Sequence, residues 1–375
     1  MSDFCGVFPY LVSPVDQDGT VREKVLRDLV EDLINKGVHG LTPLGSTGEF
    51  AYLTWPQRKR IVEIVVDAAR KRVPVVAGVS HAASSEASRQ AREFEKIGAD
   101  GILAVLETYF PLKDDQVYDY FAAIAHSVQC PVVLYTNPSF QTTDLSFNVV
   151  AKLAEIPNVE YIKDASSNTG KLMNIANKLA GKIKIFSASA HVPLFVMMLG
   201  GVGWMAGPAC IIPEQSVKLY NLAREKKWDE AMAYQKKLWE INMSFQKYSL
   251  APCIKAALEI QGFAVGDPIA PLRPLSTQEK EELKQIHNID FNSMLQAFER
   301  PENILFYKRV MEMAPPSTRS RCHGLKMIYR FNIHQFLYKA ADPTETHLMI
   351  QPETKIETQT QKPARQQKPR SKHCG

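Results

Sequence analysis

The segment Val159-Glu160-Tyr161-Ile162-Lys163-Asp164-Ala165-Ser166 is a short run, rich in β-branched and aromatic residues, that ends in a cation. It predicts a buried strand whose last inward side chain is the Lys163 amine. A lysine just past a strand usually lies on the surface, and that interpretation stays open here. The alternative is an amine at the open end of a barrel strand, where it can form a Schiff base with a carbonyl carbon.

Short apolar runs alternate with longer amphipathic segments over the first 210 residues. Most of the runs are continuously apolar, which favours parallel strands buried on both faces. The eight predicted strands are Cys5–Val12, His39–Pro43, Val73–Val79, Gly101–Leu106, Pro131–Tyr135, Val159–Lys163, Ile183–Ser187 and Val202–Ala206. Eight strand–helix units predict an α/β fold of the (β/α)8 TIM-barrel type over residues 1–225.

The pattern changes after the eighth unit. Consecutive helices without intervening strands are predicted, and they form a C-terminal helical region of the same domain over residues 226–290. Residues 291–349 form an extension whose structure the sequence does not predict. Residues 350–375 are rich in Gln, Thr, Lys and Pro, and we expect a disordered basic tail there.

Charge and cysteine usage limit the function classes. Residues 291–375 hold 14 Lys and Arg against 7 Asp and Glu, so the formal net charge of +5 belongs to this end of the chain. The remainder has no basic excess that would indicate nucleic-acid binding. Six single cysteines without a CxxC pair predict neither a disulfide framework nor a zinc site, and we expect no cofactor or metal. No secretory signal or membrane-length apolar run is present, so we expect a cytoplasmic protein.

The second predicted strand leads into Thr42-Pro43-Leu44-Gly45-Ser46-Thr47-Gly48-Glu49-Phe50. Glycines on both sides of two hydroxyls let the backbone approach a ligand closely. Backbone N–H groups with the Ser46 and Thr47 hydroxyls predict a small anion site suited to a carboxylate. A tight glycine turn with capping hydroxyls is the alternative.

The fifth predicted strand ends in Val133-Leu134-Tyr135-Thr136-Asn137-Pro138. Tyr135 is expected to point into the barrel mouth near Lys163, where a phenol can relay protons during imine formation and carbon–carbon cleavage. A core tyrosine with a backbone partner is the alternative.

The motifs GSTGE, YTNP and YIKDAS, in this order and spacing, resemble those of the dihydrodipicolinate synthase / N-acetylneuraminate lyase superfamily over residues 4 to about 287. The resemblance implies a barrel with a C-terminal helical region, assembled as a homotetramer. It implies that Lys163 forms an imine with a 2-oxo acid such as pyruvate and that Tyr135 relays protons. The substrate-binding residues that it implies are Ser46, Thr47, Gly48, Ala188 and Met205.

Two positions depart from that family's pattern. Dihydrodipicolinate synthase takes a second relay tyrosine from a neighbouring subunit, and the best match here is Phe110, with Tyr109 one residue away. The synthase also uses an arginine to meet the carboxylate of its second substrate, and here Phe140 stands in that place with Gln141 beside it. These losses argue against true dihydrodipicolinate synthesis. Residues 136–143 instead offer hydroxyls and amides suited to a polyol or a less charged partner.

Three hypotheses follow. The first is a Schiff-base lyase, of the aldolase or synthase type, that acts on pyruvate or a related 2-oxo acid together with an aldehyde or sugar-acid co-substrate. The second is a dehydratase that removes water from a 2-oxo-3-deoxy sugar acid through the same imine. The third is a catalytically inactive barrel with a regulatory or scaffold role.

Overall fold

The computed structural model describes residues 3–141, 143–166, 168–188 and 193–287. All of them belong to one compact unit, Met1–Met294. The predicted extension over 291–349 and the predicted basic tail over 350–375 lie outside the described residues.

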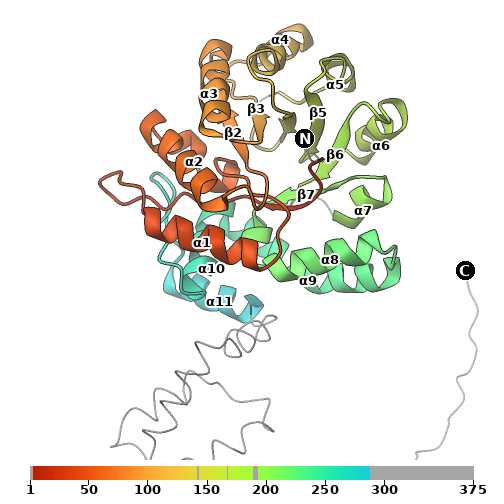
Figure 1. The fold of residues 1–375 in the computed structure, drawn as a ribbon. Helices are drawn as coiled ribbons and strands as arrows, with labels where there is room; N and C mark the ends of the chain where they lie inside the picture. The colour runs from red at the N-terminus through yellow and green to blue at the C-terminus, as the bar shows by residue number, and fades with distance from the viewer. Residues whose placement is uncertain (1–2, 142, 167, 189–192, 288–375) are drawn as a thin grey trace, which may run out of the picture. The chain divides into compact units, whose positions relative to one another are not determined.

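Seven parallel strands form one curled sheet at the centre of this unit (Figure 1), in the order β1-β7-β6-β5-β4-β3-β2. They are β1 (Gly6–Pro9), β2 (Val76–Ser80), β3 (Gly101–Val105), β4 (Val132–Thr136), β5 (Val159–Asp164), β6 (Lys184–Ser187) and β7 (Gly203–Ala206). Each overlaps one of the sequence-predicted strands. Almost every residue in them is buried, as expected for parallel strands covered on both faces.

The remaining predicted strand, His39–Pro43, is not a regular strand. It makes isolated parallel bridges, Tyr10 with Thr42 and Leu41 with Val75, and so connects β1 to β2 across the gap in the sheet. The Leu41 amide donates to the Pro74 carbonyl at 2.9 Å, and the Thr42 amide donates to the Pro9 carbonyl at 3.0 Å. The segment is short because the chain leaves the extended conformation at Leu44, whose φ is 60°.

Helices surround the sheet. They are α1 (Glu23–Asn35), α2 (Trp55–Ala69), α3 (Ser84–Ile97), α4 (Asp114–Ala125), α5 (Phe147–Leu153), α6 (Thr169–Lys178), α7 (Pro193–Met198) and α8 (Pro213–Arg224). The start of α2 follows its sequence: the Thr54 amide donates to Gln57 Oε1 at 2.8 Å in a capping box.

Side chains of each strand alternate between two cores. The inner core fills the ring of strands and includes Phe8, Tyr161 and Phe186. The outer core lies between strands and helices and includes Leu134 and Ile162. This alternation decides which residues of a strand end can face a central cavity.

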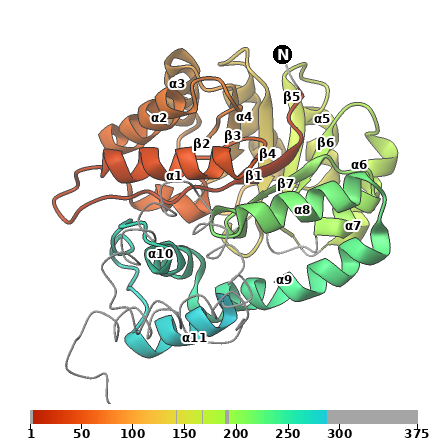
Figure 2. The same ribbon diagram turned by 60° about the horizontal axis from the view of Figure 1, so that its bottom comes forward.

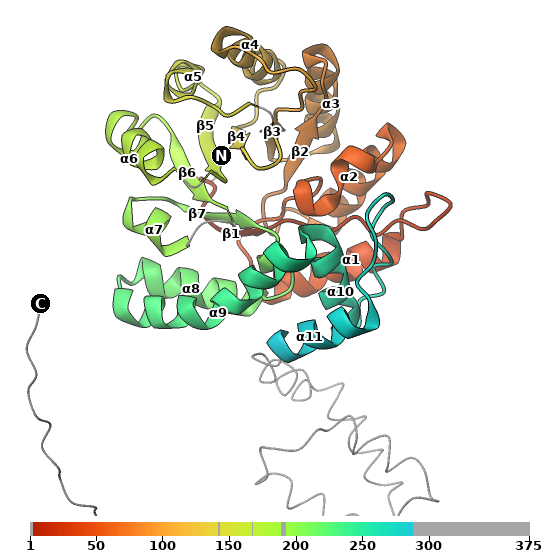
Figure 3. The same ribbon diagram turned by 180° about the vertical axis from the view of Figure 1, so that it is seen from behind.

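Three more helices follow α8: α9 (Trp228–Tyr248), α10 (Leu250–Ile260) and α11 (Thr277–His287). Figures 2 and 3 show them together along one side of the ring of helices. The helix α10 packs against α9 and against the short 3-10 turn η1 (Ser46–Gly48). The α9–α10 junction therefore lies near the hydroxyl-bearing turn that the sequence singles out.

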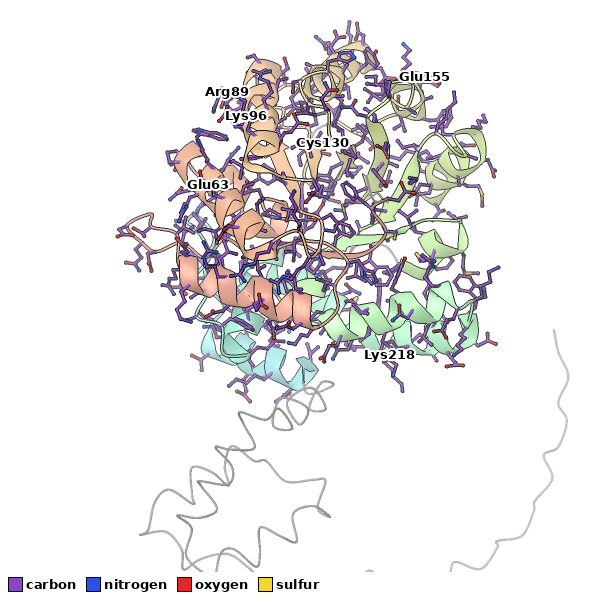
Figure 4. The ribbon with its side chains drawn as sticks, in the orientation of Figure 1. Glu63, Arg89, Lys96, Cys130, Glu155 and Lys218 are labelled. Carbon is purple, nitrogen blue, oxygen red and sulfur yellow. The ribbon has the colours of Figure 1, made fainter. Side chains whose placement is uncertain are left out.

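Charged side chains project from the outer helices, and Figure 4 labels examples on α2, α3 and α8. Many form exposed pairs with neighbours on the same helix, such as Lys96 with Glu93 at 3.1 Å. Among the described residues, no helix is long and apolar enough to cross a membrane.

Candidate active site

The strands β4 and β5 bring Tyr135 and Lys163 side by side, since their Cα atoms are direct partners in the parallel register. Each is the last inward residue of its strand, and the next residues, Thr136 and Asp164, point outward. Both inward side chains therefore lie at the carboxyl end of the ring of strands, where barrel enzymes place their reactive groups.

The Lys163 amine is buried, with the residue only 3% exposed. Its Nζ lies 3.9 Å from the centre of the Tyr135 ring and 4.9 Å from the centre of the Tyr10 ring. Burial lowers the pKa of Lys163 because it disfavours the charged form, while Tyr135 and Asp164 oppose this shift. More of the amine is therefore neutral than in a surface lysine, and only the neutral amine can attack a carbonyl carbon.

The Tyr135 hydroxyl is held in place by two polar neighbours. Asn137 Nδ2 donates to it at 2.9 Å, and Ser46 Oγ lies 3.2 Å away. The phenol thus connects the lysine to the turn that carries the predicted carboxylate site. A hydroxyl in such a chain can pass a proton in either direction.

A buried ionic network on the outer face of β5 fixes the two strand ends. Asp164 Oδ1 accepts from the Ser166 amide at 2.7 Å, and its Oδ2 lies 2.8 Å from the amine of Lys171 on α6. Lys171 also pairs with Asp144 at 2.9 Å, and Asp144 accepts from the Thr136 hydroxyl at 2.5 Å. Because the network ties Thr136 to Asp164, it holds the preceding residue of each strand in register.

The turn between the bridged segment His39–Pro43 and α2 is strained at both ends. Leu44 and Glu49 adopt left-handed backbone angles, with φ of 60° and 54°. This conformation costs a residue with a side chain about 1 kcal/mol or more, and it persists only where neighbouring structure enforces it. Between the two lies η1, which presents Ser46.

A buried ion pair enforces the second bend. Glu49 Oε2 lies 2.7 Å from the amine of Lys255 on α10, and both side chains are nearly inaccessible. Lys255 also donates to the Asp267 carbonyl at 2.9 Å, and Glu49 Oε1 accepts from the Ile269 amide at 2.7 Å. We infer that Glu49 supports the turn, and that Lys255 connects it to the C-terminal helices.

The three predicted turn residues are placed differently. Ser46 lines the central cavity. Thr47 is fully buried, and its hydroxyl has no hydrogen-bond partner among the described residues. Gly48 is used inside the turn: its amide donates to the Gly45 carbonyl at 2.9 Å, and its carbonyl accepts from Ser13 Oγ at 2.7 Å. The substrate-binding roles of Thr47 and Gly48 stay predictions.

These elements enclose a cavity of about 530 Å³. We call the part of this cavity around the lysine the cavity floor, and we define it by five buried lining residues, Tyr10, Tyr135, Lys163, Ala188 and Met205. Ala188 and Met205 thus line the same cavity as the lysine, and their substrate-binding roles stay predictions.

The exposed part is the cavity rim, which consists of Ser139, Phe140, Gln246 and Ser249. Half-buried Asn242 of α9 lies between floor and rim. Lys163 is the only charged residue among the described residues that line the cavity. A buried cation with hydroxyls nearby suits a small carboxylic acid that carries a carbonyl group.

Comparisons with known proteins agree with this geometry. The family model described as the dihydrodipicolinate synthetase family matches residues 3–289. The chain belongs to this family. One relative, the 4-hydroxy-tetrahydrodipicolinate synthase of Acidiphilium cryptum, is 33% identical over 282 residues, which cover 75% of this chain and 96% of the relative. Another, an uncharacterized DapA-like lyase of Halobacterium salinarum, is 31% identical over 74% of this chain and 91% of the relative.

Solved structures of the dihydrodipicolinate synthase family share the fold. A dihydrodipicolinate synthase of Acinetobacter baumannii, in complex with pyruvate, is 28% identical and has a TM-score of 0.72 over 76% of this chain and 98% of that one. The prophage protein YagE of E. coli K12, also in complex with pyruvate, is 27% identical with a TM-score of 0.73 over 77% and 99% of the two chains.

Phe140, which the sequence predicts at the family's arginine position, lies at the rim of the cavity. Phe140 is 67% exposed and lines the cavity. Gln141 is turned away, since it accepts from the Asn137 amide at 2.6 Å and donates to the Leu106 carbonyl at 2.8 Å. The rim that we describe therefore offers no cation to a second substrate.

The polar residues of 136–143 are mostly used within the protein, contrary to expectation. The Thr136 hydroxyl donates to Asp144, and the Thr143 hydroxyl accepts from the Leu112 amide at 3.2 Å. Ser139 and the Asn137 side chain line the cavity, while Thr142 lies outside the described residues. Sequence reasoning missed the groups from α9 and the α9–α10 junction, which are Asn242, Gln246 and Ser249.

The two aromatic residues considered for the family's second relay tyrosine are both exposed. Tyr109 is 85% exposed and Phe110 is 72% exposed, with ring centroids 4.9 Å apart. Both follow β3, and neither lines the cavity of this single chain.

Sequence reasoning also missed Tyr10, the residue after β1 whose ring is beside the lysine. The available signal was its place at the carboxyl end of an apolar run.

Proposed function

We propose that this lyase forms an imine between Lys163 and the 2-oxo carbon of pyruvate or a closely related 2-oxo acid. The observation that carries the proposal is the Lys163 amine, buried on the cavity floor with a lowered pKa and with the Tyr135 ring 3.9 Å away. The enamine derived from this imine would make or break a carbon–carbon bond with an aldehyde partner.

The chemistry balances without a cofactor. The Nζ lone pair adds to C2 of the acid, and the carbonyl oxygen takes up a proton to give a carbinolamine. The carbinolamine hydroxyl takes up a second proton and leaves as water, which gives the protonated imine; this group withdraws electrons so that a proton can leave C3. The resulting enamine attacks an aldehyde carbon, whose oxygen takes up a proton, and hydrolysis of the new imine by water then releases the product and the free Lys163 amine. Tyr135, bonded to Ser46 and Asn137, is placed to deliver and collect these protons.

The acid's carboxylate would lie against the η1 turn. Among the described residues, the amides of Ser46 and Thr47 donate to no backbone or side-chain acceptor, whereas those of Gly48 and Glu49 are used within the turn. Two free amides with the Ser46 hydroxyl provide the donors that a carboxylate requires.

The partner would differ from that of a 4-hydroxy-tetrahydrodipicolinate synthase. Phe140 and an amide- and hydroxyl-lined rim favour an uncharged or polyhydroxylated aldehyde. The same rim favours, as a second candidate, dehydration of a 2-oxo-3-deoxy sugar acid through the same imine. Product analysis on a panel of such acids separates the two, because an aldolase releases pyruvate and a dehydratase releases water and retains the carbon chain.

We also propose that the chain assembles with copies of itself, as a homotetramer. Two large aromatic side chains, Tyr109 and Phe110, are exposed next to each other, and such exposure is typical of a contact surface. Light scattering of the purified protein gives the mass that tests this.

Borohydride trapping tests the imine. Protein treated with pyruvate and borohydride should gain a stable adduct that peptide mapping locates at Lys163. Lys163→Ala should lack it, whereas Lys184→Ala, which removes a lysine at the start of β6 that pairs with Asp3, should trap as the wild type does. No pyruvate-dependent adduct on the wild-type protein would contradict the proposal. Turnover of any 2-oxo acid that disappears in Lys163→Ala would reject an inactive barrel.

A further inference from the structure

Tyr10 is a second phenol on the cavity floor, on the opposite side of the ring of strands from β4. The residue follows β1 and is 2% exposed, and its ring centre lies 4.9 Å from Lys163 Nζ. Its backbone is fixed on both sides, because its amide donates a hydrogen bond to the Ala206 carbonyl at 3.1 Å and it forms a bridge with Thr42. The ring thus stands at a defined position in the cavity.

The Tyr10 hydroxyl has no hydrogen-bond partner among the described residues, although it is buried. Buried phenols usually find one, because an unpaired polar group in a protein interior is destabilising. The other barrel tyrosines illustrate the difference: the Tyr135 hydroxyl bonds Asn137, and that of Tyr161 accepts from the Phe4 amide at 2.9 Å. Of these three tyrosines, Tyr10 is the one whose hydroxyl has no hydrogen-bond partner among the described residues, and the residue lines the cavity.

The ring of Tyr10 lies directly against the residue that begins the η1 turn. A Cβ placed on Gly45 would come within 2.5 Å of Tyr10 Cδ2 and 2.6 Å of Cε2, so only glycine allows this approach. The Tyr10 ring therefore lies close both to the Lys163 amine and to the residue that precedes the η1 turn, where the carboxylate donors are found.

We propose that the Tyr10 hydroxyl donates a hydrogen bond to the carboxylate of the bound 2-oxo acid and thereby makes Tyr10 a substrate-binding and specificity residue. This inference rests on the proposed function, since it requires a 2-oxo acid at Lys163. Burial, and secondarily Tyr135, raise the pKa of Tyr10 well above its ordinary value, so the phenol keeps its proton and can donate.

The Tyr10→Phe variant tests the inference because it removes the hydroxyl and keeps the ring. Trapping of pyruvate by cyanoborohydride at Lys163 is measured against pyruvate concentration. We expect the half-saturating concentration to rise about tenfold or more, as for loss of one hydrogen bond to a charged group, with the same adduct at saturation. Tyr161→Phe, which removes a barrel hydroxyl that does not line the cavity, is the matched control and should leave the pyruvate dependence unchanged.

Acetone is a carbonyl compound without a carboxylate. Comparing it with pyruvate shows whether the Tyr10 hydroxyl acts on the carboxylate or on the carbonyl group. Its trapping rate at Lys163 should be the same in Tyr10→Phe and wild type. An equal loss with acetone and pyruvate would overturn the carboxylate assignment, and an unchanged half-saturation with pyruvate would overturn the role of Tyr10 while the imine proposal stands. Absence of any adduct on the wild-type protein would overturn both.

Discussion

The floor and the rim of the cavity differ in burial, in chemistry and in their agreement with the family. The floor is buried and holds one cation between two phenols, and its lysine and Tyr135 match the family's motifs. The rim is exposed and uncharged, and it presents Phe140 where the resemblance predicts an arginine in the synthases. On the proposed function, this difference implies that imine formation depends on the floor and that the choice of partner depends on the rim.

Loss of the Tyr135 hydroxyl should have the largest effect, which is on the rate of imine formation at Lys163. In Tyr135→Phe, proton transfer loses its bridge between Lys163 and Ser46, so the rate of adduct formation with pyruvate should fall by roughly 10²-fold or more. Rapid-quench trapping measures this rate, with Tyr161→Phe as the control. A rate within twofold of the wild type would remove Tyr135 from the mechanism.

Loss of the buried Glu49–Lys255 ion pair should have the next largest effect, which is on the free energy of unfolding. Lys255→Met leaves the Glu49 carboxylate buried without its partner, which typically costs about 3 kcal/mol or more of unfolding free energy. Urea unfolding measures the loss, and the double variant Glu49→Gln/Lys255→Met should recover part of it.

Lys284→Met, which removes an exposed lysine on α11 that pairs with Glu281, is the control for Lys255→Met and should change stability little. Equal stability of the two single variants would mean that the Glu49–Lys255 pair does not hold the turn.

The pH dependence of imine formation distinguishes a buried lysine on the cavity floor from a lysine at the protein surface. The pKa of Lys163 is lowered from its ordinary value of 10.5, so the neutral amine appears at lower pH. The rate of imine formation should therefore rise with pH and level off below pH 10.5, and should fall as pH drops through the lowered pKa. Cyanoborohydride trapping from about pH 6 to about pH 10 gives the profile. A rate that keeps rising to the pKa of a free lysine would place the amine in water.

A substitution at the rim should have the smallest effect, which is on the use of the aldehyde partner and not on imine formation at Lys163. Phe140→Arg adds a cation where the family's synthases have one, so kcat/KM with an aldehyde that carries a carboxylate should rise about tenfold. Pyruvate trapping at Lys163 should stay as in the wild type. An equal rise in kcat/KM with an uncharged aldehyde would contradict this, because it would show that the size of the side chain at position 140, and not its charge, limits the reaction.

The floor could largely be predicted from the sequence because strand alternation is local. The runs that end at Tyr135 and Lys163 each place one polar residue inward, and two adjacent parallel strands bring such residues together. The predicted strand His39–Pro43 was wrong as a regular strand, since the left-handed Leu44 ends the extended conformation after two bridged residues. Apolar composition alone does not report such a backbone turn.

The rim could not be predicted because it depends on how distant elements pack. Asn242, Gln246 and Ser249 have helical spacing, but their sequence does not reveal that this face of α9 covers the cavity. The side chain of Gln141, expected near a substrate, is instead bonded to the backbone of Leu106, 35 positions away. For Tyr10, the apolar run indicates a strand end, but its place beside the lysine depends on the turn that brings Gly45 against its ring.

A crystal structure of the protein soaked with pyruvate tests the central claim most directly. We predict continuous density from Lys163 Nζ to C2 of the acid, with the carboxylate against Ser46 and the Tyr10 hydroxyl and with C3 facing the rim. An unmodified amine with pyruvate bound elsewhere, or with no pyruvate in the cavity, would contradict the account.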